Sequence, residues 1–445
     1  MQKKIFIKTF GCQMNEYDSN RIYDSVKRIG FIKSQDQDNL DCFVLNTCHI
    51  RDKAKEKVYH EIGRVKKLYK EKNKPIVVVA GCVAQAENQE MLNREPYIDI
   101  VIGPQSYHKI NDKLKNFIKD NKIEETEFDT ISKFNYFDNI ENKNSKVSSY
   151  LTIQEGCDKF CSFCVVPYTR GAEYSRSVNE VIMEAKVLIK NGTKEICLLG
   201  QNVNAYHGEY HKKNWNLANL IKEIASLGVK RIRYMTSHPV DMDDDLIKTH
   251  GEVCALMPYL HLPVQSGDNG VLKTMNRKYN IEQYINIINR LREVRSDMAF
   301  SSDFIIGFPG ETEKAFKNTI NLIKEVKYSQ AYSFKYSRRP GTPGSIMKQQ
   351  ISEVIKTERL KIVQDILNEQ QKEFNKSFIG EYLEVLFEKF GRKDCQIVGK
   401  SPYLQSVYID NADFKIGDVA NLKIITASKN SMEGKLIKKD QKALN

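Results

Sequence analysis

The sequence has no long apolar run. None of its 445 residues belongs to a stretch of about eighteen or more consecutive apolar residues, so no transmembrane helix is expected. The start of the chain, MQKKIFIKTFGCQMNEYDSN, becomes polar after a few positions, which argues against a secretory signal. We therefore expect a soluble, cytoplasmic protein with no membrane association.

Acidic residues are fewer than basic ones. Asp and Glu number 57 against 69 Lys and Arg, a formal net charge of +12. This excess favours a polyanionic partner such as nucleic acid, but a Lys-rich chain with solvated helix faces would show the same excess. The ten cysteines would remain reduced in the cytosol, where they are typically metal ligands or buried thiols.

The chain is too long for one hydrophobic core, so several domains are expected. In the first third, buried-type strands alternate with helical stretches, which predicts an open parallel α/β sheet. The expected strands are 4–10, 41–47 and 75–81, and the helices are 15–30, 53–72 and one near residue 85. We place this domain at 1–123. Residues 124–147 lose the apolar periodicity and are predicted to be a linker.

Six further strand and helix repeats follow the linker. They predict a partial (β/α)6 barrel over residues 148–377, with its chemistry at the carboxyl ends of the strands. The expected strands are 149–156, 194–202, 231–238, 259–267, 300–308 and 331–337. A long helix from 352 to 374 leads to short alternating strands, which predict a small β-barrel at 378–441.

A cysteine follows each of the first three strands. Cys12, Cys48 and Cys82 are separated by 36 and 34 residues, close to one βα unit of about 30 or more. The carboxyl ends of parallel strands share one edge of the sheet, so the three thiols should lie together there. A single such cysteine would be an ordinary buried thiol, but three in register favour a common site. Core packing is predicted for the remaining isolated cysteines, Cys42, Cys197, Cys254 and Cys395.

Three more cysteines stand in QEGCDKFCSFCVVPYTRG, residues 154–171. Cys157, Cys161 and Cys164 have no fourth partner nearby, whereas a structural zinc site needs four ligands and the bacterial ferredoxin run is spaced differently. Three thiolates can hold three corners of a [4Fe-4S] cluster and leave the fourth iron open. An open iron suits S-adenosylmethionine, which binds through its amine and carboxylate and is cleaved by one electron.

This C-x3-C-x2-C motif after the first barrel strand resembles that of radical S-adenosylmethionine enzymes. With the preceding α/β domain and a final β-barrel similar to the TRAM domain, nearly the whole chain resembles the methylthiotransferase family. Several stretches are most similar to the branch that acts on isopentenyl-adenosine beside the anticodon of tRNA. They are CDKFCSFCVVPYTRG, LLGQNVNAY, HLPVQSG, GFPGETE and KYSRRPGTPG.

The resemblance implies two [4Fe-4S] clusters. Cys157, Cys161 and Cys164 would hold the one that cleaves S-adenosylmethionine, and Cys12, Cys48 and Cys82 one whose open iron carries the sulfur to be transferred. One S-adenosylmethionine would methylate that sulfur, and a second would supply the radical that removes hydrogen from carbon-2 of the adenine. The implied partners are the tRNA anticodon loop and an electron donor such as flavodoxin or ferredoxin. We expect a monomer.

Other polar and glycine residues at strand ends are candidates for binding S-adenosylmethionine. They are Gln201, Asn202, Gln265, Ser266, Gly307 and Gly310. Turn formation is the alternative role for all of them.

Three alternative functions stay open. Two are methylthiotransferases, for threonylcarbamoyl-adenosine in tRNA or for an aspartate of a ribosomal protein. The third is a two-cluster electron carrier that binds RNA, although an electron carrier needs no open iron.

Overall fold

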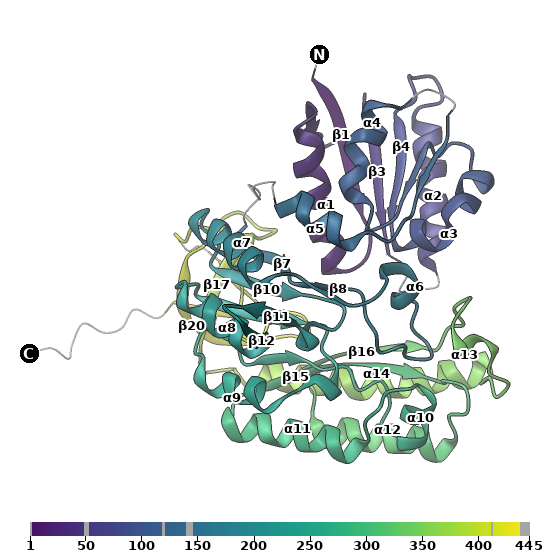
Figure 1. Cartoon of the computed structure of the whole chain (residues 1–445). Coiled ribbons are helices and arrows are strands. Elements are labelled where there is room, and N and C mark those ends of the chain that lie inside the picture. Colours follow the sequence, from purple (N-terminus) through teal and green to yellow (C-terminus); the bar gives the residue numbers. More distant parts are fainter. Residues whose placement is uncertain (1, 49–52, 118–120, 139–145, 411–412, 437–445) are drawn as a thin grey trace, which may run out of the picture.

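The computed structural model describes residues 2–48, 53–117, 121–138, 146–410 and 413–436. An N-terminal α/β part lies on a larger central α/β part, and a small β-barrel lies beside the central part (Figure 1). The predicted fold class is therefore confirmed. The exact domain boundaries stay predictions.

The N-terminal part is a six-stranded parallel sheet in the order β2-β1-β3-β4-β5-β6. Apolar residues of α1 and α4 cover one face of it, and those of α2 and α3 cover the other. The strands are β1 (Lys3–Thr9), β2 (Phe31–Lys33), β3 (Cys42–Thr47), β4 (Ile76–Gly81), β5 (Ile100–Ile102) and β6 (Ile123–Glu125). The helices are α1 (Gln13–Lys27), α2 (Lys53–Leu68), α3 (Cys82–Arg94) and α4 (Ile110–Lys115).

The segment predicted to be a linker contains regular structure. Strand β6 pairs with β5 at the edge of the sheet, and α5 (Thr130–Asp138) follows it. The apolar pattern missed β6 because its buried side chain is charged. Glu125 forms ion pairs with Lys109 at 3.0 Å and with Lys113 at 2.8 Å.

The central part contains the six predicted parallel strands. They form two runs, β7-β10-β13 and β14-β15-β16, joined by a parallel bridge between Ile232 and Leu256. The strands are β7 (Ser148–Thr152), β10 (Glu195–Leu199), β13 (Arg231–Met235), β14 (Tyr259–His261), β15 (Ala299–Ile306) and β16 (Gln330–Lys335). The larger helices are α7 (Val178–Lys190), α8 (Leu217–Ser226), α9 (Asp244–Glu252), α11 (Ile281–Val294) and α12 (Glu313–Val326). Shorter elements are β8 (Gln154–Glu155), α6 (Val166–Arg170), β9 (Tyr174–Ser175), β11 (His207–Tyr210), β12 (Lys213–Asn216), α10 (Asn269–Thr274) and α13 (Pro343–Ile346).

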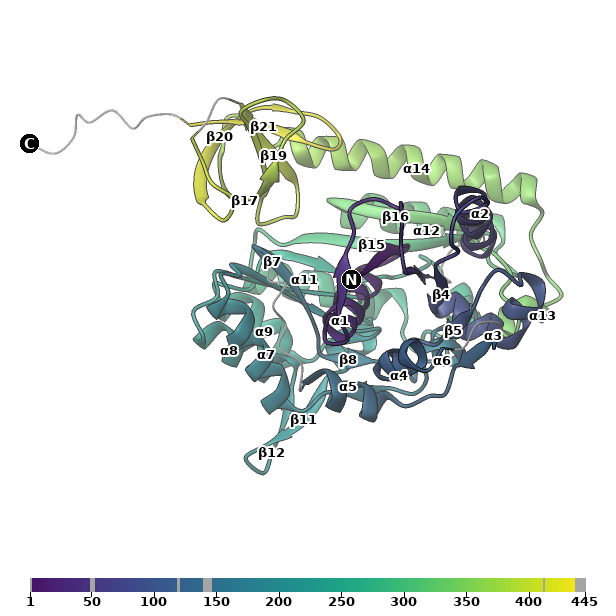
Figure 2. The same cartoon turned by 90° about the horizontal axis from the view of Figure 1, so that it is seen from above.

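Helix α14 (Glu353–Lys376) runs from the central part to the barrel (Figure 2). The barrel is closed in the order β17-β18-β19-β21-β20 around its own apolar core. Its strands are β17 (Tyr382–Phe390), β18 (Gln396–Lys400), β19 (Ser406–Asp410), β20 (Val419–Ala427) and β21 (Met432–Lys435). A buried arginine of β13, Arg231, donates hydrogen bonds to the carbonyl of Lys400 and to the carboxylate of Glu384, and so links the barrel to the central sheet.

Two of the four isolated cysteines lie where they were predicted. Cys42 and Cys197 are buried, but Cys254 and Cys395 are exposed, so the core assignment is wrong for these two. Both lie outside the regular strands and helices, where no apolar pattern determines burial. None of the described helices is both long enough and apolar enough to span a bilayer.

Candidate active site

The first cysteine set lies at the carboxyl edge of the N-terminal sheet. Cys12 and Cys48 follow β1 and β3, and Cys82 begins α3. Two glycines allow these segments to converge. A Cβ atom on Gly11 (φ +111°) would lie 2.1 Å from the Cβ of Cys48, and one on Gly81 (φ +94°) would lie 2.2 Å from a backbone carbonyl at the end of β3. Only glycine fits at either position.

Asn15, in the first turn of α1, holds this edge together. Its Nδ2 donates to the carbonyls of Phe10 and Thr47, both at 2.8 Å, and thereby joins the chain after β1 to the end of β3. Its Oδ1 accepts a hydrogen bond from Arg170 of the central part at 3.0 Å. The same oxygen lies 3.9 Å from Sγ of Cys12.

The thiol of Cys12 ionises more readily than an ordinary cysteine. A hydrogen bond from Cys48, aided by the positive charge of Arg170, lowers the pKa of Cys12 to about 6. Burial raises the pKa of Cys82, although Arg170 again opposes the shift. Metal binding requires thiolates, so this set of donors fits an iron–sulfur cluster.

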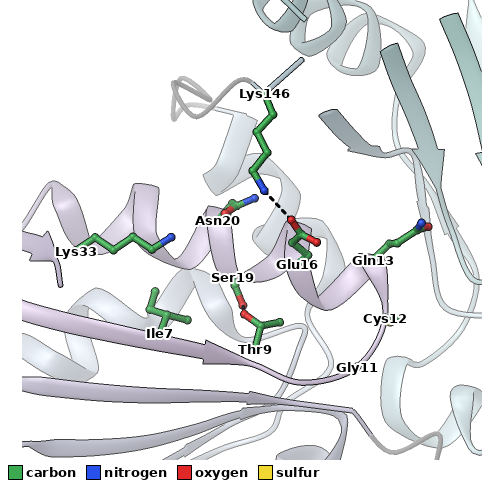
Figure 3. A pocket seen from close by; sticks show the side chains of 10 residues that line it. All are labelled: Ile7, Thr9, Gly11, Cys12, Gln13, Glu16, Ser19, Asn20, Lys33 and Lys146. Carbon is green, nitrogen blue, oxygen red and sulfur yellow. Dashed lines mark hydrogen bonds and ion pairs between the residues drawn. The ribbon is translucent and has the colours of Figure 1, made fainter. Parts of the chain in front are cut away.

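Cys12 is also open to solvent through a cavity of about 400 Å³ between β1 and α1 (Figure 3). An ion pair between Nζ of Lys146 and Oε1 of Glu16, 2.7 Å apart, lies beside it. The lining residues are Ile7, Thr9, Gly11, Cys12, Gln13, Glu16, Ser19, Asn20, Lys33 and Lys146. A small molecule could therefore reach the edge where the first set lies.

The second set occupies the loop after β8, at the carboxyl end of the barrel strands. Gly156 opens the loop with φ +79°, where a Cβ atom would lie 1.9 Å from the carbonyl of Ala172. The amide of Cys157 donates to the carbonyl of Gly171 at 3.2 Å. Burial raises the pKa of Cys157 to about 11 and that of Cys164 to about 12. Both thiols are therefore protonated near neutral pH, and a bound metal would favour their thiolate forms.

A single metal ion does not fit either set. Nowhere in the described part of the chain do three His, Cys, Asp or Glu side chains gather in an arrangement that could hold one ion. A zinc ion needs its ligands about 2.0–2.3 Å away, whereas each thiolate of a cubane cluster binds a different iron. The donor type and the incomplete ligand count fit a [4Fe-4S] cluster at each set.

A buried network of four charges joins the two sets. Arg170, at the end of α6, donates to Glu155 and to Asp18, both at 2.9 Å. Lys133 pairs with the same carboxylates, at 2.8 and 3.3 Å. All four side chains are 3% exposed or less. Helix α6 also packs against α3, which begins at Cys82, so the second cysteine loop is coupled to the first set (Figure 1).

Two predicted cofactor residues follow β10. The Oε1 of Gln201 accepts a hydrogen bond from the amide of Gly156 at 2.5 Å and so holds the start of the cysteine loop. The Nδ2 of Asn202 donates to Asp241 at 2.8 Å. Its Oδ1 is buried and has no partner among the described residues, so it is available to accept a hydrogen bond from a ligand.

Three of the other predicted cofactor residues, Ser266, Gly307 and Gly310, lie in turns or at their ends. The hydroxyl of Ser266 accepts from the amide of Asp268 at 3.3 Å. Gln265, with φ +75°, instead pairs with Phe304 of β15 in a parallel bridge. Gly307 and Gly310 have φ +73° and +86° in the turn between β15 and α12. The turn role therefore agrees with Ser266, Gly307 and Gly310 but not with Gln265, and contact of all four with S-adenosylmethionine stays a prediction.

Two arginines of the site were missed by the sequence analysis. Arg170 reaches Asp18 across 152 positions of the chain, and Nη1 of Arg277 donates to Sγ of Cys161 at 3.6 Å across 116 positions. No local spacing or periodicity marks either residue. The one signal in the sequence is the position of Arg170, which follows Cys164 by only six residues.

The chain is similar to known families over most of its length. Residues 4–103 match Uncharacterized protein family UPF0004, residues 151–323 match the Radical SAM superfamily, and residues 376–437 match the TRAM domain.

Full-length relatives carry the name tRNA-2-methylthio-N(6)-dimethylallyladenosine synthase. The protein of that name from Pelagibacter ubique is 56% identical, over 99% of each chain. The one from Rickettsia typhi is 52% identical, over 98% of this chain and all of its own. Among solved structures, the radical S-adenosylmethionine methyltransferase TsrM from Kitasatospora setae matches with a TM-score of 0.54 at 11% identity, over 78% of this chain and 75% of TsrM. At that identity the likeness concerns the fold alone.

Proposed function

Because the chain belongs to the family of tRNA-2-methylthio-N(6)-dimethylallyladenosine synthases, we propose that it adds a methylthio group to carbon-2 of dimethylallyladenosine, that is isopentenyl-adenosine, beside the tRNA anticodon. The observation that carries this proposal is 56% identity over 99% of both chains to a relative of that name. The site agrees with it, since two incomplete cysteine sets lie on elements that pack together.

In this proposal Cys157, Cys161 and Cys164 hold one [4Fe-4S] cluster, and the cysteines at the sheet edge, Cys12, Cys48 and Cys82, hold a second. When bound, the clusters and S-adenosylmethionine supply one-electron cleavage of a carbon–sulfur bond and the sulfur that is transferred. The convergence of the sheet-edge cysteines at Gly11 and Gly81 supports their assignment to one site.

The chain's own residues orient these groups. Gln201 fixes the entry to the cysteine loop through the amide of Gly156, and the buried Oδ1 of Asn202, which has no partner among the described residues, would accept a hydrogen bond from S-adenosylmethionine. The charge network around Arg170 keeps the two cysteine sets in one relative position. The adenine must leave its stack to enter, which costs a few kcal/mol and least in a single-stranded loop such as the anticodon loop.

The proposed partners are tRNA and an electron donor such as flavodoxin or ferredoxin, and the proposed setting is a cytoplasmic monomer. The net charge of +12 supports binding to phosphates, which should weaken as salt rises.

Cysteine variants test the cluster assignment. Cys161→Ala should lose about half of the bound iron, because the two clusters hold equal iron, and should no longer make 5′-deoxyadenosine. Cys48→Ala should still make 5′-deoxyadenosine but add no sulfur to tRNA. Cys254→Ala, which changes an exposed thiol outside both sets, is the matched control and should behave as wild type. Wild-type 5′-deoxyadenosine formation by Cys161→Ala would refute the assignment.

Substrate choice is tested by nucleoside mass spectrometry. The reconstituted enzyme is offered isopentenylated, threonylcarbamoylated and unmodified tRNA side by side. Methylthio product from the isopentenylated tRNA alone is expected. Preference for the threonylcarbamoylated tRNA would contradict the proposed substrate and leave the cluster assignment intact.

A further inference from the structure

The last residue of α10 and the residues that follow it hold the second cysteine loop, between Cys157 and Cys164, in place. The amide of Ser162 donates to the carbonyl of Met275 at 3.0 Å, and its hydroxyl donates to the carbonyl of Thr274 at 2.8 Å. The Nδ2 of Asn276 donates to the carbonyl of Phe160 at 3.0 Å. The loop is therefore held from within the barrel by a segment more than a hundred residues away in sequence.

Arg277, the next residue of this segment, turns its side chain toward the loop. Its Nη1 donates to Sγ of Cys161 at 3.6 Å, its Nη2 to the carbonyl of Pro263 at 2.6 Å and its Nε to the hydroxyl of Tyr279 at 3.0 Å. The residue is only 5% exposed. The guanidinium is thus fixed in place on three sides.

No carboxylate balances this charge within the described part of the chain. Arg277 takes part in none of the ion pairs found there, in contrast to Arg170 with its two carboxylates. The carbonyl of Pro263 and the phenol of Tyr279 are neutral. A buried charge without a counter-charge is costly, so an anionic group bound beside Sγ of Cys161 would be stabilised by Arg277.

Cys161 becomes negative when it binds iron, because a metal ligates the thiolate. The cation of Arg277 then lies one hydrogen bond away from a sulfur ligand of the cluster. Adding an electron makes the cluster more negative, so a fixed cation at this distance favours the reduced state. Hydrogen bonds to the sulfurs and net charge are known determinants of cluster potential.

We propose that Arg277 is a positioning residue that raises the reduction potential of the cluster held by Cys157, Cys161 and Cys164, through its hydrogen bond to Sγ of Cys161. This inference rests on the proposed function, since it requires a cluster in that loop. It assigns to Arg277 the task of making one-electron reduction by a protein donor easier. Lysine would retain the charge but not the planar three-sided attachment.

The test is a redox titration followed by electron paramagnetic resonance, without S-adenosylmethionine or tRNA. It is done in a Cys48→Ala background, so that the cluster of the second loop alone is observed. In Arg277→Gln we expect the ratio of oxidised to reduced cluster at a fixed potential to rise about tenfold, equal to a midpoint about 59 mV lower for one electron. The midpoint of Arg277→Lys should lie between that of Arg277→Gln and that of the parent protein, Cys48→Ala.

Arg292→Gln is the matched control, because Arg292 also donates to a backbone carbonyl, that of Val326, but touches neither cysteine set. Its midpoint should equal that of the parent. An unchanged midpoint in both Arg277 variants would overturn the inference. If Arg277→Gln folds by circular dichroism but takes up no iron, Arg277→Lys decides the question: a midpoint below that of the Cys48→Ala parent supports the inference, and an unchanged midpoint overturns it. A parent Cys48→Ala protein without any cluster would instead refute the proposed function.

Discussion

At the scale of single residues, the two buried arginines of the site have opposite surroundings. Arg170 has two carboxylate partners and a lysine that shares them, so its network is neutral overall. Arg277 has only neutral acceptors and a cysteine. The first arrangement is suited to holding two parts of the molecule together, and the second to interacting with a negatively charged cluster.

Removing Arg170 should therefore destabilise the protein even without clusters. Arg170→Gln leaves Asp18 and Glu155 buried with less positive charge, which should cost about 3–5 kcal/mol of unfolding free energy. Chemical denaturation of the metal-free wild type and variant measures this difference in unfolding free energy. Arg290→Gln breaks an exposed pair with Asp244 and should change little. Equal effects of the two substitutions would contradict the structural role of Arg170.

The buried side chain of His250 should make the free energy of unfolding depend on pH. Burial, aided by Arg295, lowers the pKa of His250 to about 3, and its Nε2 lies 2.7 Å from the hydroxyl of Tyr234. Below about pH 6.5 the unfolded chain binds a proton that the folded chain does not, so stability should fall as pH drops from there toward 3. Between pH 7 and 5, wild type should lose about 2 kcal/mol more than His250→Gln. The exposed His207→Gln should follow wild type.

At the scale of elements, the shape of the second cysteine loop depends on its first glycine. Gly156→Ala combines a positive φ with a contact of 1.9 Å to the carbonyl of Ala172, so the loop must shift. We expect lower iron content and weaker 5′-deoxyadenosine formation. Gly192→Ala is the control, because its φ is +98° but nothing lies within 4 Å of the added Cβ, which leaves only backbone strain of about 1–2 kcal/mol. The same iron loss in both variants would exclude the contact as the cause.

At the scale of the whole molecule, the barrel is fixed to the central sheet as well as to α14. Arg231 of β13 reaches the carbonyl of Lys400 and the carboxylate of Glu384, at 2.8 and 2.9 Å. Arg231→Gln should loosen this contact, lower tRNA affinity several-fold and speed proteolysis between α14 and β17. The formation of 5′-deoxyadenosine without tRNA should not change, because the cysteine loop lies elsewhere. Unchanged affinity for tRNA would show that barrel position does not matter for binding.

Local spacing in the sequence was enough to predict the six strands of the central part and the closed C-terminal barrel. It also divided six of the cysteines into two sets, one at the ends of three strands and one within a single loop. A strand period, a turn or a C-x3-C-x2-C run depends on residues only a few positions apart, so each is visible without a structure. The same reasoning failed at β6, where Glu125 is buried by pairing with lysines, and at the exposed Cys254 and Cys395.

Only the tertiary structure decided which side chains surround the cysteines. Arg170 meets Asp18, and Arg277 meets Cys161, across more than a hundred residues, and such contacts depend on how whole elements pack. The electrostatic field at a thiolate is the sum over every nearby charge, whatever its position in the chain. The sequence by itself therefore determined which thiols are the candidates for cluster ligands, and the packing determined the charges that act on them.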